Sequence, residues 1–251
     1  MIARPVRALS SLVAVLLAAA CTNSFEIPIE TPIRPKLDVA AFQRVLVAGF
    51  ISGGTEDVDG NLETTRLLRS QLRTKSQLRV IDSDVLPLVD VASEGRDSGG
   101  AAPAAPAAIK EEKDLEAYEH VFANVEYWKK IGEEYQQPLI VTGTVMFTPL
   151  QRNSIVQREQ EVYDSFGRRR VVPVRTYMER KGFSLDGRFI FIDGRSGATL
   201  HSESFGEQIL YNANQTTPAL SSYFELMDRL IPTFLSTLSS QKIKGTRILL
   251  Q

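Results

Sequence analysis

The sequence has very few of the side chains that form disulfides and metal sites. Its 251 residues include one cysteine and two histidines. A single thiol cannot form a disulfide within the chain, and so few thiol and imidazole groups argue against a zinc site. With 29 basic and 30 acidic side chains, the chain also lacks the positive excess typical of nucleic-acid-binding proteins. Composition therefore excludes more chemistry than it supports, and we expect no cofactor and no metal.

Familiar catalytic motifs are absent as well. The stretch GFISGGTEDVDG, residues 49–60, has neither the lysine nor the glycine spacing of a nucleotide-binding loop, and its acidic residues lack the calcium-loop spacing. His120 and His201 have no second histidine three or four residues away, and no G-x-S-x-G motif occurs. We therefore expect no catalytic residue. A carboxylate pair assembled only in three dimensions leaves an envelope hydrolase open as an alternative.

The N-terminal segment is typical of a bacterial export signal. Arg4 and Arg7 precede an apolar run over residues 9–20, which is too short for an ordinary transmembrane helix. The run ends in AAAC, which resembles a lipobox, although Ala18 stands where leucine is commonest. We predict a signal peptide over residues 1–20 and lipidation of Cys21, and Thr22 resembles the pattern that directs lipoproteins to the outer membrane. The alternative is a secreted protein in which Cys21 is a free thiol.

Composition divides the remainder of the chain. Residues 21–43 contain three prolines among polar side chains and predict an extended, lipid-anchored tether. Residues 44–240 predict a single domain, interrupted by an insertion over residues 92–108 that is rich in alanine and proline and that we expect to be flexible. Residues 241–251 form a C-terminal tail.

Hydrophobic patterns within residues 44–240 predict an α/β (α+β) domain. Short apolar runs predict strands at 44–50, 78–81 and 139–148, and three- and four-residue spacing predicts helices at 62–74, 110–135 and 218–238. Asn61 is the expected N-cap of the first helix. Two hairpins are expected, one with arms at 154–163 and 171–178 and one with arms at 183–192 and 198–209. The fold class is a mixed sheet with an N-terminal β-α-β unit, antiparallel hairpins and a C-terminal helix packed on the sheet.

This order of elements resembles a superfamily of bacterial envelope proteins. VLVAGF, LRVID, PLIVTGTV and FIFIDGRSGATLHSESF occur in the order seen in the curli secretion channel lipoprotein CsgG, in lipoprotein activators of penicillin-binding proteins and in the N-terminal domain of TolB. The resemblance covers roughly residues 44–238 and concerns element order rather than an invariant signature. It implies a mixed sheet covered by helices, a periplasmic location and a function in protein–protein contacts.

One region has an unusual charge balance. Residues 151–181 contain eight basic and four acidic side chains, with Arg168, Arg169 and Arg170 consecutive at the expected hairpin turn. Guanidinium groups bind carboxylates and phosphates through paired hydrogen bonds. We predict that these three arginines bind a partner, either an envelope protein or an anionic cell-wall or lipid component. The alternative is a solubilised turn.

The sequence thus favours an outer-membrane-anchored periplasmic lipoprotein that acts as a non-catalytic interaction or assembly module. We expect it to contact the membrane through its lipid anchor and not to bind nucleic acid. The alternatives are a subunit of a curli-type export channel and an envelope hydrolase. A membrane-spanning hairpin needs an apolar set of alternate residues, and neither set in the arm 154–163 is apolar. The oligomeric state is left open.

Overall fold

The computed structural model describes residues 24–94, 109–163, 165–212, 215 and 217–250. A five-stranded mixed sheet has the strand order β3-β2-β4-β5-β6, and a separate two-stranded sheet pairs β1 with β7. The strands are β1 Ser24–Ile33, β2 Arg44–Gly54, β3 Arg79–Val80, β4 Leu139–Tyr163, β5 Arg169–Asp193, β6 Thr199–Asn212 and β7 Gln241–Leu250. The helices are α2 Gly60–Lys75, α3 Leu88–Glu94, α4 Glu112–Glu116, α5 Glu119–Ala123, α6 Val125–Glu134 and α7 Ala219–Leu238.

The predicted fold class is confirmed. Strand β2 is parallel to both β3 and β4, and β4, β5 and β6 are antiparallel to one another. Helix α2 connects β2 to β3 as the expected β-α-β unit. It begins at Gly60 because Asp59 accepts a hydrogen bond from the backbone of Leu62 at 2.9 Å. Asn61, the cap expected from the sequence, instead accepts a hydrogen bond from the backbone of Phe50 at 2.7 Å.

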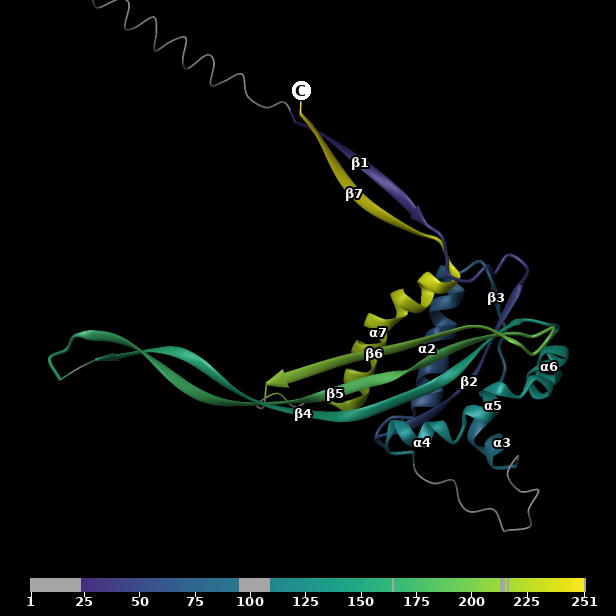
Figure 1. The fold of residues 1–251 in the computed structure, drawn as a ribbon, viewed down its shortest axis with the longest axis horizontal. Helices are drawn as coiled ribbons and strands as arrows, with labels where there is room; N and C mark the ends of the chain where they lie inside the picture. Colours follow the sequence, from purple (N-terminus) through teal and green to yellow (C-terminus); the bar gives the residue numbers. More distant parts are fainter. Residues whose placement is uncertain (1–23, 95–108, 164, 213–214, 216, 251) are drawn as a thin grey trace, which may run out of the picture. The chain divides into compact units, whose positions relative to one another are not determined.

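Two hydrophobic clusters lie on opposite faces of the sheet (Figure 1). Helices α2 and α7 cover one face, where Leu68, Tyr223 and Phe234 are almost completely buried. Helices α3 to α6 cover the other face, where Trp128 is completely buried. The strands in the middle of the sheet are apolar on both faces, as expected for strands covered by helices on both sides.

The helix expected over residues 110–135 is divided into α4, α5 and α6. Helix α6 starts anew at Val125 because the side chain of Asn124 accepts a hydrogen bond from the backbone of Tyr127 at 3.1 Å. Apolar spacing continues through all three helices, so periodicity alone did not reveal the breaks. None of the helices in the described part of the chain is long and apolar enough to cross a lipid bilayer.

The two hairpins expected from the sequence are joined through shared strands. Strands β4 and β5 pair without interruption from Leu139 with Asp193 to Tyr163 with Arg169. Pro149 does not end β4, although proline has no N–H to donate. The pairing of β2 with β4 ends at Phe147, so no strand on that side needs a hydrogen bond from position 149. The predicted turns at 164–168 and 193–197 lie where expected, although the position of residue 164 is not described.

The segments expected as a tether and a tail also contain strands. The chain forms two compact units, residues 1–35 with 240–251 and residues 36–239. In the first unit, β1 pairs antiparallel with β7 from Ser24 with Leu250 to Ile33 with Gln241, and Lys242 donates a hydrogen bond to Glu30 at 3.1 Å. Of the insertion predicted at 92–108, residues 92–94 complete α3, and residues 95–108 lie outside the described residues.

Candidate functional site

Strands β4 and β5 continue together past the end of β6 (Figure 1). We call residues 152–163 and 169–180 the ribbon. The pairing of β6 with β5 ends at Arg180, and within the described chain no third strand accompanies the ribbon beyond that residue. Arms of roughly 12 residues at about 3.3 Å each extend about 40 Å. No ribbon residue belongs to either hydrophobic cluster, so the ribbon contributes little to the core.

The strand register separates the charges of the ribbon onto two faces. Directly paired residues share a face, and successive residues alternate between faces. One face, which we call the arginine face, contains four arginines and no acidic side chain: Arg152, Ser154, Val156, Arg158, Gln160, Val162, Arg170, Val172, Val174, Thr176, Met178 and Arg180. The opposite, mixed face contains Glu159, Glu161 and Glu179 together with Arg169 and Arg175. Positive charge is therefore concentrated on one side of the ribbon.

The three arginines predicted to bind a partner lie at the end of the ribbon. Arg168 belongs to the turn, and its guanidinium carbon lies 5.4 Å from the centroid of the Phe166 ring. Arg169 is on the mixed face and forms an ion pair with Glu161. Arg170 is on the arginine face, opposite Val162. The structure thus brings the three side chains to one end of the hairpin. They do not share one face, because consecutive residues of a strand point to opposite faces.

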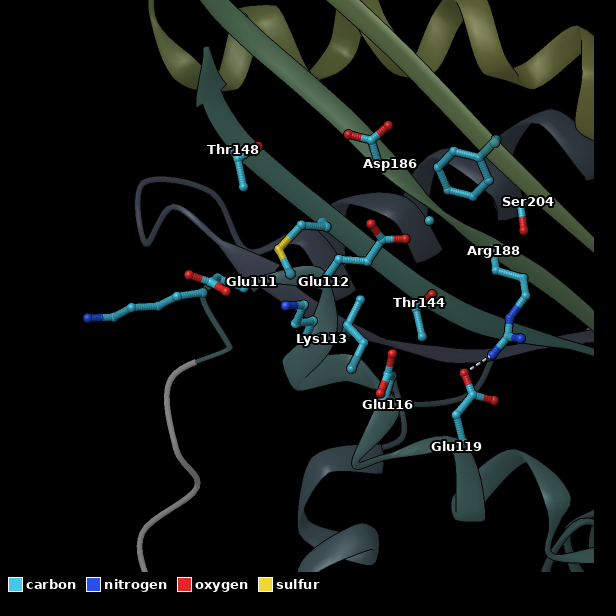
Figure 2. Close-up of a pocket in the computed structure, with 15 residues that line it drawn as sticks. Glu111, Glu112, Lys113, Glu116, Glu119, Thr144, Thr148, Asp186, Arg188 and Ser204 are labelled. Carbon is cyan, nitrogen blue, oxygen red and sulfur yellow. Dashed lines mark hydrogen bonds and ion pairs between the residues drawn. The ribbon is translucent and has the colours of Figure 1, made fainter. Parts of the chain in front are cut away.

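A groove of about 770 Å³ lies between the α4 segment and strands β4, β5 and β6 (Figure 2). Carboxylates from two distant parts of the sequence line it: Glu111, Glu112, Glu116 and Glu119 on the helical side and Asp186 on β5. Figure 2 shows Glu119 directed at Arg188, with which it forms an ion pair. The sequence predicts a helix over residues 110–135, but nothing local indicates that this helix packs beside β5.

One carboxylate near this groove has a purely structural role. Asp114 accepts hydrogen bonds from the backbone N–H groups of Lys110 and Glu111, each at 2.9 Å, and these bonds lower the pKa of the Asp114 carboxyl. They anchor the start of α4, which forms a wall of the groove. The groove is therefore a mixed polar surface to which Lys110, Lys113 and Arg188 also contribute positive charge.

Neither histidine belongs to a metal-binding cluster. Within the described ranges, no group of three or more His, Cys, Asp and Glu side chains is placed to hold a metal ion. His120 Nδ1 lies 2.9 Å from the carbonyl oxygen of Ala117, and His201 Nε2 lies 3.6 Å from Glu203. Cys21, the predicted lipidation site, lies outside the described residues.

Glu203 joins β6 to α7 and to Lys36. Its carboxylate accepts a hydrogen bond from Thr237 Oγ1 at 2.8 Å and forms an ion pair with Lys36. Burial raises the pKa of Glu203, but the hydrogen bonds from Lys36 and Thr237, the charge of Lys36 and the contact with His201 outweigh it, and the pKa is lowered. These contacts make Glu203 a structural residue.

Comparisons with known proteins identified similar solved structures but no matching sequence family. No protein-family model and no curated protein sequence matches the chain. The chain is structurally similar to lipoprotein GNA1162 from Neisseria meningitidis, with 12% identity and a TM-score of 0.34 over 76% of this chain and 97% of that one. It is also similar to the PelC dodecamer from Paraburkholderia phytofirmans, with 14% identity and a TM-score of 0.36 over 85% and 98% of the chains. A third similar structure is the LpoB C-terminal domain from Salmonella enterica, with 10% identity and a TM-score of 0.33 over 79% and 94%.

Proposed function

We propose that the protein is an outer-membrane lipoprotein, anchored through Cys21, whose α/β domain is a non-catalytic interaction module in the periplasm. The ribbon carries this proposal. Isolated two-stranded ribbons are marginally stable in water, and this one adds no residue to either core. A long hairpin that folding does not need is accounted for by contact with another molecule. In this proposal the ribbon is the docking element, and Arg168, Arg169 and Arg170 stay its predicted binding residues.

The chemistry of the ribbon disfavours the export-channel alternative. Its arms are longer than the 9–11 residues that a membrane-spanning strand needs, but such a strand presents an apolar alternate set to lipid. On the arginine face, Arg152, Arg158, Arg170 and Arg180 interrupt the valines, and three glutamates interrupt the mixed face. Each face thus carries charge along its length. We therefore propose that the ribbon docks from water and does not span a bilayer.

The anchor has a direct test. Replacing Cys21 with serine removes the only thiol in the chain and therefore the acylation site. Acyl chains attached at Cys21 would anchor the protein stably, so we expect the Cys21→Ser protein to leave the membrane fraction when membranes are washed in 0.5 M salt, which weakens purely electrostatic binding. A Cys21→Ser protein that has its N-terminal segment cleaved and stays fully membrane-bound after this wash would contradict the lipidated cysteine.

The docking role is tested by photo-crosslinking in cells. A photoreactive residue replaces Ile155, whose side chain on the mixed face of the ribbon is 71% exposed. The matched control replaces Leu220 on α7, which is 43% exposed and is not part of the ribbon. We expect a specific envelope protein to be captured from position 155 and not from position 220. A ladder of self-adducts from position 155 would support the channel alternative, and equal or absent capture from both positions would overturn docking of the ribbon to an envelope protein.

A further inference from the structure

The end of the ribbon combines exposed apolar side chains with arginines. We call residues 162–163 and 165–172 the tip. Phe166 is 79% exposed, Tyr163 66%, Val171 52% and Val162 43%. Side chains of this size normally bury most of their surface, and exposed apolar clusters rimmed by polar groups mark contact sites for proteins or membranes. Phe166 has the highest exposed fraction among the large apolar side chains that the structure describes.

Positive charge surrounds this apolar end. Arg168 lies over the Phe166 ring, and Arg169 and Arg170 follow on opposite faces of the ribbon. Glu161, the ion-pair partner of Arg169, and Asp164 belong to the same stretch of sequence, so the formal charge of residues 161–172 is +1. Behind the tip, the arginine face continues with Arg158, which lies opposite Val174. This face contains no carboxylate. An anionic surface approached by the tip meets arginines at the end and along one side of the ribbon.

We propose that the tip binds the surface of an anionic phospholipid bilayer, with Phe166 entering the boundary between headgroups and acyl chains and the arginines contacting headgroup phosphates. This proposal rests on the proposed docking role of the ribbon and names its ligand at the tip. Guanidinium groups bind phosphate through paired hydrogen bonds, and an aromatic ring is favourable at the headgroup level. The shape agrees with this assignment, because a narrow, convex turn suits a soft, continuous surface better than the pocket that a protein hot spot requires.

Binding to vesicles tests this proposal. The full chain carrying Cys21→Ser, which lacks an acyl anchor, is sedimented with vesicles of 70% phosphatidylcholine and 30% phosphatidylglycerol and with vesicles of phosphatidylcholine alone. Whatever the N-terminal segment contributes is common to all variants, so only differences between variants are interpreted. One variant changes Arg168, Arg169 and Arg170 to glutamine. Its matched control changes the exposed Arg66, Lys129 and Lys130 to glutamine.

A second pair of variants separates apolar insertion from charge. Phe166→Ser removes the exposed ring, and Leu220→Ser, on α7, is the matched control. Each arginine near an anionic bilayer contributes about fivefold in affinity, so the triple arginine variant is expected to bind about 100-fold more weakly to the anionic vesicles. Phe166→Ser is expected to lose roughly tenfold. Both control variants are expected to bind as the parent does, and 0.5 M salt should weaken parent binding strongly.

The outcomes distinguish this proposal from the docking role itself. Equal binding of the tip variants and their controls, or equal binding to neutral and anionic vesicles, would overturn the bilayer assignment. If position 155 still captured an envelope protein in that case, the docking role would stand and the arginines would serve an acidic protein surface. If the tip variants lose vesicle binding and the control variants keep it, the result supports the bilayer as the ligand of the tip, whatever the crosslinking shows.

Discussion

Deleting the ribbon should leave the rest of the domain folded. The variant joins Arg152 to Arg180 through Asn-Gly in place of residues 153–179. Arg152 and Arg180 are directly paired, and Asn-Gly suits the two-residue turn of a hairpin. All residues of both hydrophobic clusters are retained, as is the pairing of β5 with β6. The deletion therefore removes exposed and half-buried residues but no residue of either hydrophobic cluster.

The size of the effect follows from chain entropy. The connection between the paired arginines shortens about thirteenfold, and the closure cost of a flexible loop scales as about (3/2)RT ln n, which gives at most about 2 kcal/mol of added stability. The lost pairing within the ribbon offsets part of this gain. We expect the free energy of unfolding, measured by urea denaturation, to stay unchanged or to rise by up to about 2 kcal/mol. A decrease of more than about 2 kcal/mol would refute the conclusion that the ribbon is dispensable for folding.

A substitution in the inner half of β4 provides the contrast. Gly143 has φ +149° and lies opposite Phe189, and a Cβ atom there would lie 1.8 Å from the carbonyl oxygen of Arg188. Because that neighbour is backbone in the middle of the sheet, Gly143→Ala should cost about 3 kcal/mol or more. The same strand thus contains a half in which one methyl group is not tolerated and a half that can be removed.

Two further predictions concern stability. Tyr223→Phe removes a buried hydroxyl that hydrogen-bonds Thr64 and the carbonyl oxygen of Gly60. Because Thr64 loses this partner, the free energy of unfolding in urea should fall by about 1–3 kcal/mol. A change below about 0.3 kcal/mol would show that the hydrogen bond contributes nothing. The lowered pKa of Glu203 stabilises the folded state above the ordinary carboxyl pKa of 4.5, and this contribution disappears as the pH falls through the lower folded value. Glu203→Gln should therefore reduce stability at pH 7 and have little effect at pH 3, and an equal loss at both pH values would exclude an electrostatic contribution.

Local sequence determined the elements whose signals lie within a few residues. The apolar run of β2, the amphipathic pattern of α7 and the turn at 193–197 are visible in the sequence because a buried strand, a half-buried helix and a tight turn each impose their own periodicity or composition. The location of Arg168 at the end of a hairpin follows in the same way. These features depend on contacts between neighbours in sequence, so one sequence is sufficient to predict them.

Only the tertiary structure decided what depends on register and on distant pairing. Lys242 meets Glu30 because β7 pairs with β1, and no local pattern indicates a partner 212 positions away. The arginine face exists because Arg158 lies opposite Val174, and a shift of one residue in either strand would exchange that strand's side chains between the two faces. The groove likewise required α4 to pack beside Asp186 of β5. Side-chain chemistry is written in the sequence, but which side chains share a surface is set by cross-strand pairing and packing.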